Sequence, residues 1–267
     1  MISGVLTMDR ISQKLGDLQN RKEKALVCFI TAGFPKRNST VPLVRAIEKG
    51  GADIIEIGMP FSDPLAEGPI IQHSSYVALK NGVTLDLILS QVIKIRKTSD
   101  IPIILMGYIN PILCYGAEKF FRDASSAGVD GIILPELPVE ESFRFRRLMK
   151  VCGLANIILV SPTTPLRRIK KIDQLSEGFL YCVSTTGVTG SRTSTKSGNY
   201  IQNVKSNAKK NAVLVGFGIK TPADAQAIAR KADGVIIGSA LISKIGEGTS
   251  IAGISNYVHK FKEGLRI

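Results

Sequence analysis

The chain has 267 residues, of which 44% are hydrophobic and 21% charged, a composition typical of soluble globular proteins that excludes a disordered chain. Its length suits one α/β barrel, so we expect a single domain over residues 1–267. The formal net charge of +13 would suit an anionic ligand, but the basic residues are dispersed, and no aromatic-and-basic pattern predicts nucleic-acid binding.

Targeting and redox features favour the cytoplasm. The apolar runs are far shorter than the roughly 20 residues of a membrane-spanning helix, and the N-terminus lacks a signal-peptide pattern. Four scattered cysteines without C-x-x-C spacing indicate reduced thiols, and His73 and His259 lack metal-ligand spacing. We therefore expect a cytoplasmic protein without a metal, and without membrane or nucleic-acid contacts.

In chain order, residues 8–22 carry apolar side chains at helical spacing, which predicts an extra helix before the main fold. From Lys24 onward a unit repeats: a short apolar run, a turn, and an amphipathic helix, the first of which extends from Ser39 or Thr40 to about Lys49. The predicted strands are Ala25–Ile30, Asp53–Ile57, Ile101–Met106, Gly131–Leu134, Asn156–Val160, Leu180–Val183, Ala212–Val215 and Gly234–Ile237.

Nearly all of these strands are apolar on both faces, which is typical of parallel strands covered by helices. Eight such units predict a closed (β/α)8 TIM barrel. An open doubly wound sheet is the alternative, but Thr31-Ala32-Gly33-Phe34-Pro35 is not the glycine-rich turn that usually follows its first strand. The long loops after strands two and six are candidate site loops, because barrel active sites lie at the C-terminal ends of the strands.

Glycine turns after strands seven and eight predict a phosphate site. Gly216-Phe217-Gly218-Ile219 precedes one helix, and Gly238-Ser239-Ala240 opens the next. Barrels commonly bind phosphate with backbone N–H groups of these two loops. The glycines could merely turn the chain, but their occurrence after both strands favours phosphate.

The loop after strand six, residues 184–196, is rich in glycine and hydroxyl side chains and carries two cations. Its composition fits both a lid that closes over an anionic ligand and a plain flexible linker. The length of the loop within a compact barrel favours the lid.

Two carboxylates are candidates for acid–base catalysis. Glu56 lies among isoleucines in the second strand, where burial raises a carboxyl pKa, and the predicted strands offer no Lys or Arg to pair with it. Glu67 lies in the next loop and could instead be a first-turn helix acid. Asp63 is explained equally well as a turn residue between Ser62 and Pro64.

Three further residues follow or lie in strands and could face the site. Glu136 follows strand four, although an acid at a helix entry is the simpler reading. Tyr108 and Tyr181 could touch an aromatic substrate, although tyrosines packed in the core are commoner.

Several segments together resemble the tryptophan synthase α subunit over nearly the whole chain. They are Phe29–Pro35, Glu56–Pro69, Gly107–Pro111, Thr185–Gly190 and Gly216–Ile219. Within them, Pro60-Phe61-Ser62-Asp63-Pro64-Leu65-Ala66 is highly specific to that family. The resemblance implies a lyase that cleaves indole-3-glycerol phosphate to indole and glyceraldehyde 3-phosphate by a retro-aldol reaction in tryptophan biosynthesis, without a cofactor of its own.

The same resemblance implies residue roles. Glu56 matches the acid/base that protonates indole C3, and Glu67 matches the carboxylate that accepts the indole N–H. The implied substrate contacts are Phe29, Tyr108, Tyr181 and Thr189, and the implied phosphate contacts are Gly190, Phe217, Gly218, Gly238 and Ser239.

The resemblance also implies a partner. Asp63, Asn110 and Pro111 match surfaces that meet the β subunit, which carries pyridoxal phosphate and takes the indole, in an α2β2 heterotetramer. Glu67 and Glu136 stand where the family ordinarily has the shorter Asp. Two hypotheses follow: a competent lyase, or an impaired α subunit that mainly binds and allosterically activates β. A third and much less favoured hypothesis is that the chain is another barrel enzyme that acts on a phosphorylated sugar.

Overall fold

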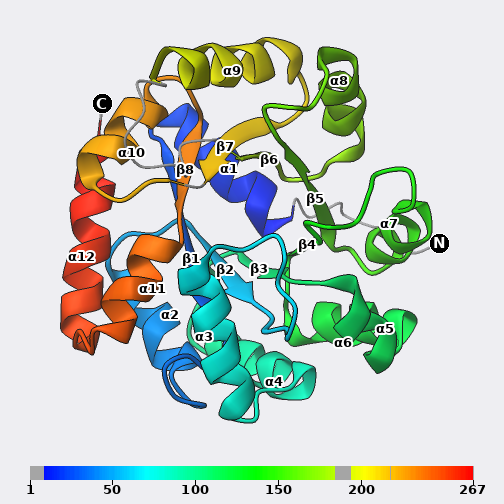
Figure 1. Ribbon diagram of the computed structural model, residues 1–267, viewed down its shortest axis with the longest axis vertical. Helices are drawn as coiled ribbons and strands as arrows, with labels where there is room; N and C mark the ends of the chain where they lie inside the picture. Colours follow the sequence, from blue (N-terminus) through cyan, green and yellow to red (C-terminus); the bar gives the residue numbers. More distant parts are fainter. Residues whose placement is uncertain (1–8, 184–193, 217, 267) are drawn as a thin grey trace.

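A closed barrel of eight parallel strands forms the centre of the molecule (Figure 1), as the sequence predicted. The computed structural model describes residues 9–183, 194–216 and 218–266. The strands follow one another around the barrel in chain order, and β8 pairs with β1 to close it. They are β1 Ala25–Thr31, β2 Ile54–Gly58, β3 Ile103–Met106, β4 Gly131–Ile133, β5 Ala155–Val160, β6 Phe179–Val183, β7 Ala212–Gly216 and β8 Gly234–Ile237.

Helices surround the barrel, and in the part of the chain that the structure describes, three of the connections hold two helices instead of one. The double connections are those between β2 and β3, between β3 and β4, and after β8. The helices are α1 Arg10–Asn20, α2 Thr40–Lys49, α3 Pro69–Lys80, α4 Leu85–Arg96, α5 Ile109–Tyr115, α6 Ala117–Ala127, α7 Phe143–Val151, α8 Leu166–Leu175, α9 Ser194–Asn207, α10 Pro222–Ala229, α11 Ser239–Gly246 and α12 Ile251–Gly264. The predicted first helix and the helix ending at Lys49 are therefore confirmed.

The strands form because both of their faces become buried. All seven residues of β1 and all five of β2 are buried, so each alternate side chain packs either inside the barrel or under the helices. The predicted long loop after the second strand is confirmed, because residues 59–68 separate β2 from α3 without helix or strand. The loop predicted after the sixth strand lies largely outside the described residues.

Acidic side chains join neighbouring strands at the N-terminal end of the barrel. In each case a carboxylate just before one strand accepts the backbone N–H of the preceding strand: Asp53 from Leu26 at 2.8 Å, Asp130 from Ile103 at 2.7 Å, and Asp233 from Val213 at 2.8 Å. These hydrogen bonds satisfy amides at the strand ends that the ladder leaves open.

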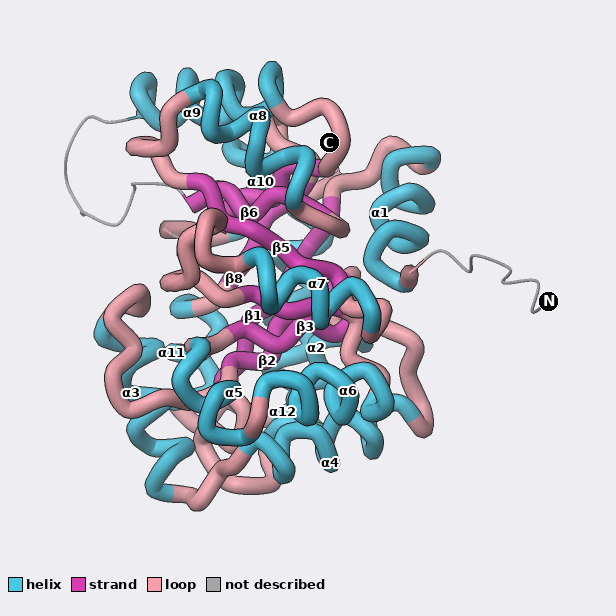
Figure 2. Tube along the Cα trace, turned by 90° about the vertical axis from the view of Figure 1, so that its right-hand side faces the viewer, coloured by secondary structure: helices cyan, strands magenta, loops and turns pink. Residues whose placement is uncertain are grey.

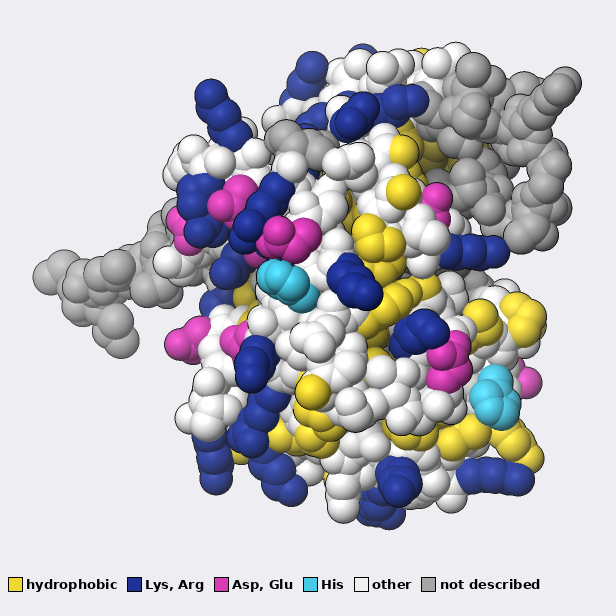
Figure 3. Space-filling model, turned by 90° about the vertical axis from the view of Figure 1, so that its left-hand side faces the viewer, with side chains coloured by type: hydrophobic (Ala, Val, Ile, Leu, Met, Phe, Trp, Pro, Cys, Tyr) yellow, Lys and Arg dark blue, Asp and Glu magenta, His cyan; other side chains and the backbone are white. Residues whose placement is uncertain are grey.

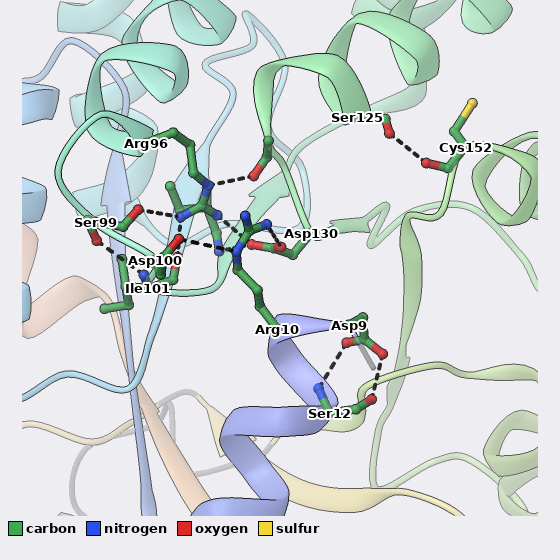
Figure 4. A network of polar contacts seen from close by, with 12 residues as sticks. Asp9, Arg10, Ser12, Arg96, Ser99, Asp100, Ile101, Ser125, Asp130 and Cys152 are labelled. Atoms are coloured by element: carbon green, nitrogen blue, oxygen red, sulfur yellow. Dashed lines mark hydrogen bonds and ion pairs between the residues drawn. The ribbon is translucent and has the colours of Figure 1, made fainter. Parts of the chain in front are cut away.

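Helix α1 stands at this N-terminal end of the barrel (Figure 2). Its Arg10 Nη1 lies 2.9 Å from Asp130 Oδ1, and Arg96 Nη2 of α4 lies 2.5 Å from Asp130 Oδ2 (Figure 4). Asp130 is buried, so this pairing of one carboxylate with two guanidinium groups neutralises a charge that would otherwise be costly. The network thereby fixes α1 to the barrel.

The surface charge is dispersed on the face where α12 lies, as the sequence predicted. Figure 3 shows Lys and Arg side chains spread across that face with acidic side chains between them. Within the described residues, none of the helices is long and apolar enough to cross a bilayer.

Candidate active site

A cavity of about 230 Å³ opens at the C-terminal ends of the strands, on the side of β1, β6 and β8. Six of the predicted site residues line it, namely Phe29, Glu67, Tyr181, Gly218, Gly238 and Ser239. Residues separated by more than two hundred positions in the sequence thus meet at one place because the barrel closes. Much of the remaining wall is apolar, which suits a ligand with a hydrophobic part.

Glu56 lies on β2 beside this cavity, in register with Phe29 of β1 and Ile104 of β3. Its side chain is completely buried, and neither carboxyl oxygen has a hydrogen-bond partner among the described residues. Burial, with a smaller contribution from the charge of Glu67, raises the pKa of Glu56 to about 8. The carboxyl group therefore carries a proton at neutral pH and can donate it.

Glu67 is the second carboxylate, and it lies in the wall of the cavity itself. Its side chain is only partly exposed, and desolvation by its apolar surroundings raises its pKa to about 7. The charge of Glu67 adds to the rise in the pKa of Glu56, so Glu56 holds its proton to a higher pH than Glu67 does. Such a pair can supply an acid and a base at neutral pH.

Tyr108 lies next to the loop that carries Glu67 and does not line the cavity. Its hydroxyl accepts a hydrogen bond from the N–H of Ala66 at 2.9 Å, and its ring stacks on Phe61 at 5.2 Å between centroids. Burial, together with the charges of Glu67 and Glu136, raises the pKa of Tyr108 to about 12. The neutral tyrosine therefore holds both ends of the loop segment that precedes Glu67.

The rings of Phe29 and Tyr181 each pack closely against a glycine, where a larger residue would collide with the ring. A Cβ added to Gly58 would lie 2.5 Å from Phe29 Cζ, and one added to Gly216 would lie 2.5 Å from the Tyr181 hydroxyl. Burial and the charges of Glu56 and Glu67 raise the pKa of Tyr181 well above its ordinary value. Tyr181 is therefore a neutral hydroxyl close to both carboxylates.

The part of the cavity wall formed by the loops after β7 and β8 has the features of an anion site. Gly218 adopts a positive φ of 76°, which glycine tolerates and other residues rarely do, and Ser239 is the first residue of α11 after Gly238. Free N–H groups at such a helix start attract a phosphate. The other three residues predicted for this region and the lid, Thr189, Gly190 and Phe217, lie outside the described residues.

The residues predicted to meet a partner are near one another on the surface. Asp63 and Asn110 are exposed, and Ser62 and Pro111 line a common shallow groove. Leu65, in the same loop, has 91% of its surface exposed. Glu136 accepts the N–H of Ile109 at 2.5 Å, so it connects β4 to the start of α5 beside Asn110.

Several residues that line the cavity were not predicted from the sequence. Met106 and Ile236 lie at the ends of β3 and β8, Ile71 lies on α3, and Lys220 follows the glycine turn after β7. Met106, Ile236 and Ile71 could not be predicted, because apolar side chains in the sequence look the same whether they line a cavity or pack in the core. Within the described residues, no cluster of three or more His, Cys, Asp or Glu is placed to hold a metal ion.

A (β/α)8 barrel whose buried acid and second carboxylate lie beside an apolar cavity with a glycine-lined end belongs to the class of barrel enzymes that use acid–base chemistry. The sequence matches the family described as tryptophan synthase alpha chain over residues 15–265. The chain belongs to this tryptophan synthase alpha chain family and is a lyase of tryptophan biosynthesis.

Relatives and solved structures agree with this assignment. The tryptophan synthase alpha chain of Geotalea daltonii is 50% identical over 237 residues, which are 88% of this chain and 89% of the relative. That of Geobacter sulfurreducens is 45% identical over 261 residues, covering 97% and 98% of the two chains. A crystal structure of tryptophan synthase subunit alpha from Legionella pneumophila superposes with a TM-score of 0.90 at 38% identity, covering 97% of this chain and 99% of that one. Nothing in these comparisons favours the impaired alpha subunit over the competent lyase.

Proposed function

We propose that the chain binds indole-3-glycerol phosphate in the cavity beside Glu56 and cleaves it to indole and glyceraldehyde 3-phosphate. The observation that carries this proposal is a fully buried carboxyl group, Glu56, which has no hydrogen-bond partner among the described residues. A second carboxyl group, Glu67, lies nearby in the wall of an apolar cavity. The indole ring would occupy the apolar part near Phe29 and Tyr181. The phosphate would bind to the amides of Gly218, Gly238 and Ser239, joined by Gly190 and Phe217.

In the proposed reaction, protonated Glu56 delivers its proton to indole C3, and positive charge develops on the ring nitrogen. Glu67, as a carboxylate, accepts the indole N–H and stabilises that charge. The ionised Glu56 then takes the proton of the glycerol hydroxyl next to the ring. The carbon–carbon bond breaks, its electron pair restores the indole ring, and the hydroxyl carbon becomes the aldehyde. Glu56 ends the cycle protonated, so no proton, water or electron is consumed.

Substitution of the two carboxylates tests this proposal. Indole release would be measured for the wild type, Glu56→Gln and Glu67→Gln, with exposed Glu118→Gln as the matched control. We expect loss of at least a thousandfold in kcat for Glu56→Gln with retained binding of glyceraldehyde 3-phosphate, and an unchanged rate for the control. Undiminished cleavage by Glu56→Gln would refute the acid/base role, and loss of ligand binding would make Glu56 structural.

We further propose that the chain works with a β subunit in an α2β2 assembly. Pyridoxal phosphate would belong to that partner, and the cleavage would need no cofactor in this chain. Exposed Asp63, Asn110 and Leu65, with Pro111, support a docking surface beside the loop that carries Glu67. Titration with a β subunit, followed by sedimentation, tests this assembly: Asp63→Ala should weaken it at least tenfold, whereas exposed Asp100→Ala at the other end of the barrel should not. Equal affinity of both variants would remove Asp63 from the interface.

A further inference from the structure

A second cavity, larger than the first, lies at the opposite end of the barrel. It encloses about 580 Å³ between α1 and the starts of β1 and β7, and Gly178 and Asp233, just before β6 and β8, also line it. A volume of this size accommodates a small molecule. Five of its lining residues are lysines, and two are carboxylates: Lys22, Lys24, Lys205, Lys209 and Lys210; Glu23 and Asp233.

The carboxylates neutralise only part of this positive charge. Lys205 Nζ pairs with Asp233 Oδ2 at 2.6 Å. Lys24 Nζ instead donates to the carbonyl of Ala232, and Lys210 Nζ to that of Ser176, both at 2.8 Å. A carbonyl orients an ammonium group but leaves its full charge in place, so these two lysines are held in position with their charge uncompensated.

The remaining two lysines, Lys22 and Lys209, form no ion pair with any carboxylate that the structure describes. Both are exposed at the cavity. Lys210 is shared with a neighbouring groove that adds three cations, Arg146, Arg147 and Lys150, and one carboxylate, Glu177. The positive potential at the cavity therefore comes from several nearby cations and extends beyond its rim.

A buried acid fixes the segment that carries two of these lysines. Asp173 of α8 is 1% exposed, and its carboxylate accepts the backbone N–H groups of Lys209, Lys210 and Asn211 at 2.8, 2.9 and 3.0 Å. The side-chain amide of Asn211 donates to the same carboxylate at 3.0 Å. The segment is thus rigid before any ligand arrives, which lowers the entropic cost of binding.

Lys22 occupies an unusual backbone conformation. It has a φ of 56°, the single positive φ of a residue other than glycine in the described part of the chain. It lies two residues after the end of α1, where its N–H donates to the carbonyl of Gln19 and the N–H of Glu23 donates to the carbonyl of Leu18. Glycine usually occupies such a helix end, and a side chain there costs about 1 kcal/mol. Lys22 therefore makes the folded protein less stable than a glycine at this position would, and it places a cation at the cavity.

We propose that this cavity binds a small polyanion, a molecule with two or more phosphate or carboxylate groups. The ligand would lie between α1 and the segment of Lys209 and Lys210, with its charges between those lysines and Lys22. Uncompensated cations, a rigid segment and an open volume together supply what such a ligand needs. The site is separate from the catalytic cavity, because no described residue lines both cavities.

Calorimetric titration with two probes tests the proposal and distinguishes phosphate from carboxylate as the anionic group that the cavity binds. The probes are inorganic tripolyphosphate and citrate, each added to protein saturated with glyceraldehyde 3-phosphate, so that the catalytic phosphate site is occupied. We expect saturable binding of at least one probe that weakens with added salt. The tighter probe identifies phosphate or carboxylate as the preferred group.

Three variants locate the binding. Lys209→Gln and Lys22→Gly should each weaken the probe at least tenfold, whereas Lys94→Gln on the exposed face of α4 should bind like the wild type. Lys22→Gly should also raise the melting temperature without the probe, because glycine relieves the backbone conformation, so its loss of binding could not come from unfolding. Indole release should be unchanged in all three. Equal weakening by Lys94→Gln, or no binding by the wild type at millimolar probe, would overturn the proposal.

Discussion

The hydroxyl of Tyr108 accepts a hydrogen bond from the backbone N–H of Ala66 at 2.9 Å, across 42 positions of sequence. Ala66 immediately precedes Glu67, so this bond ties the segment before the second carboxylate to the start of α5. The same region carries the proposed partner-facing residues Asp63 and Asn110. The position of Glu67 is therefore linked physically to the surface where a β subunit would bind.

Removal of that hydroxyl should affect catalysis more than folding. For Tyr108→Phe we expect kcat for indole release to fall on the order of tenfold, because a small displacement of a catalytic group costs much rate. The free energy of unfolding should drop by only about 1 kcal/mol, the value of one hydrogen bond. Tyr115→Phe is the control, since that hydroxyl bonds Asp86 and Asp123 away from the cavity. Equal kcat values for both variants would contradict the positioning role.

The raised pKa of Glu56 predicts a pH-dependent stability difference. The folded protein keeps a proton on Glu56 up to about pH 8, whereas the unfolded chain releases it near its ordinary pKa. The folded state therefore binds more protons between these values, so stability falls as the pH rises through that window. Glu56→Gln lacks this penalty.

Urea denaturation at pH 5, 6, 7 and 8 measures that effect. The stability of Glu56→Gln relative to the wild type should rise with pH by up to about 1.4 kcal/mol per unit. Glu247→Gln, at an exposed ion pair with Lys244, provides the comparison and should parallel the wild type. If the stability of Glu56→Gln also parallels that of the wild type across these pH values, the Glu56 carboxyl group is ionised in the folded wild-type protein.

Asp173 should be a major contributor to stability. Burial alone would raise its pKa, but hydrogen bonds from Lys210, Lys209 and Asn211 outweigh burial and hold the pKa below its usual value. In Asp173→Asn, an NH2 group replaces one of the two oxygens that accept backbone N–H groups, so hydrogen bonds are lost. The free energy of unfolding should therefore fall by about 3 kcal/mol at pH 7. Exposed Asp100→Asn should change it by less than about 0.5 kcal/mol.

The acid dependence of the same variant gives a second measurement. A lowered folded-state pKa stabilises the protein above the unfolded-state pKa, and this stability disappears as the pH falls through the folded-state value. The difference between the wild type and Asp173→Asn in urea denaturation should therefore shrink below about pH 4. A difference that stays constant down to pH 3 would show that the charge of Asp173 is irrelevant.

Gly58 should be required for the shape of the cavity. Gly58→Ala puts a Cβ 2.5 Å from Phe29 Cζ, so the ring must move, at a cost of about 1–3 kcal/mol in stability. We expect weaker substrate binding, seen as a raised KM for indole release. Phe29→Leu in the same chain should recover part of the lost stability. As a comparison, Gly16→Ala in α1 should stabilise the protein by up to about 1 kcal/mol, because no described atom outside the helix backbone lies within 4 Å of the added Cβ.

The sequence by itself determined the barrel and part of the candidate site. Short apolar strands, each followed by a helix, predict parallel strands buried on both faces, and the eight observed strands match the predicted ones within two residues at each end. Glu56 was recognisable because an acid in an apolar strand is rare. The turns at Gly218 and Gly238 were recognisable because glycine and helix starts leave a local pattern.

Only the tertiary structure decided how these parts meet. It placed Glu67 in the cavity wall and Tyr108 against the loop before it, and it brought Lys22 of the α1 end to Lys209 at the far end of the barrel. Strand burial and helix periodicity can be predicted because they depend on the pattern of apolar residues within a short stretch of sequence. Contacts between residues far apart in the chain depend instead on the closure of the barrel and the packing of its loops, which no local pattern encodes.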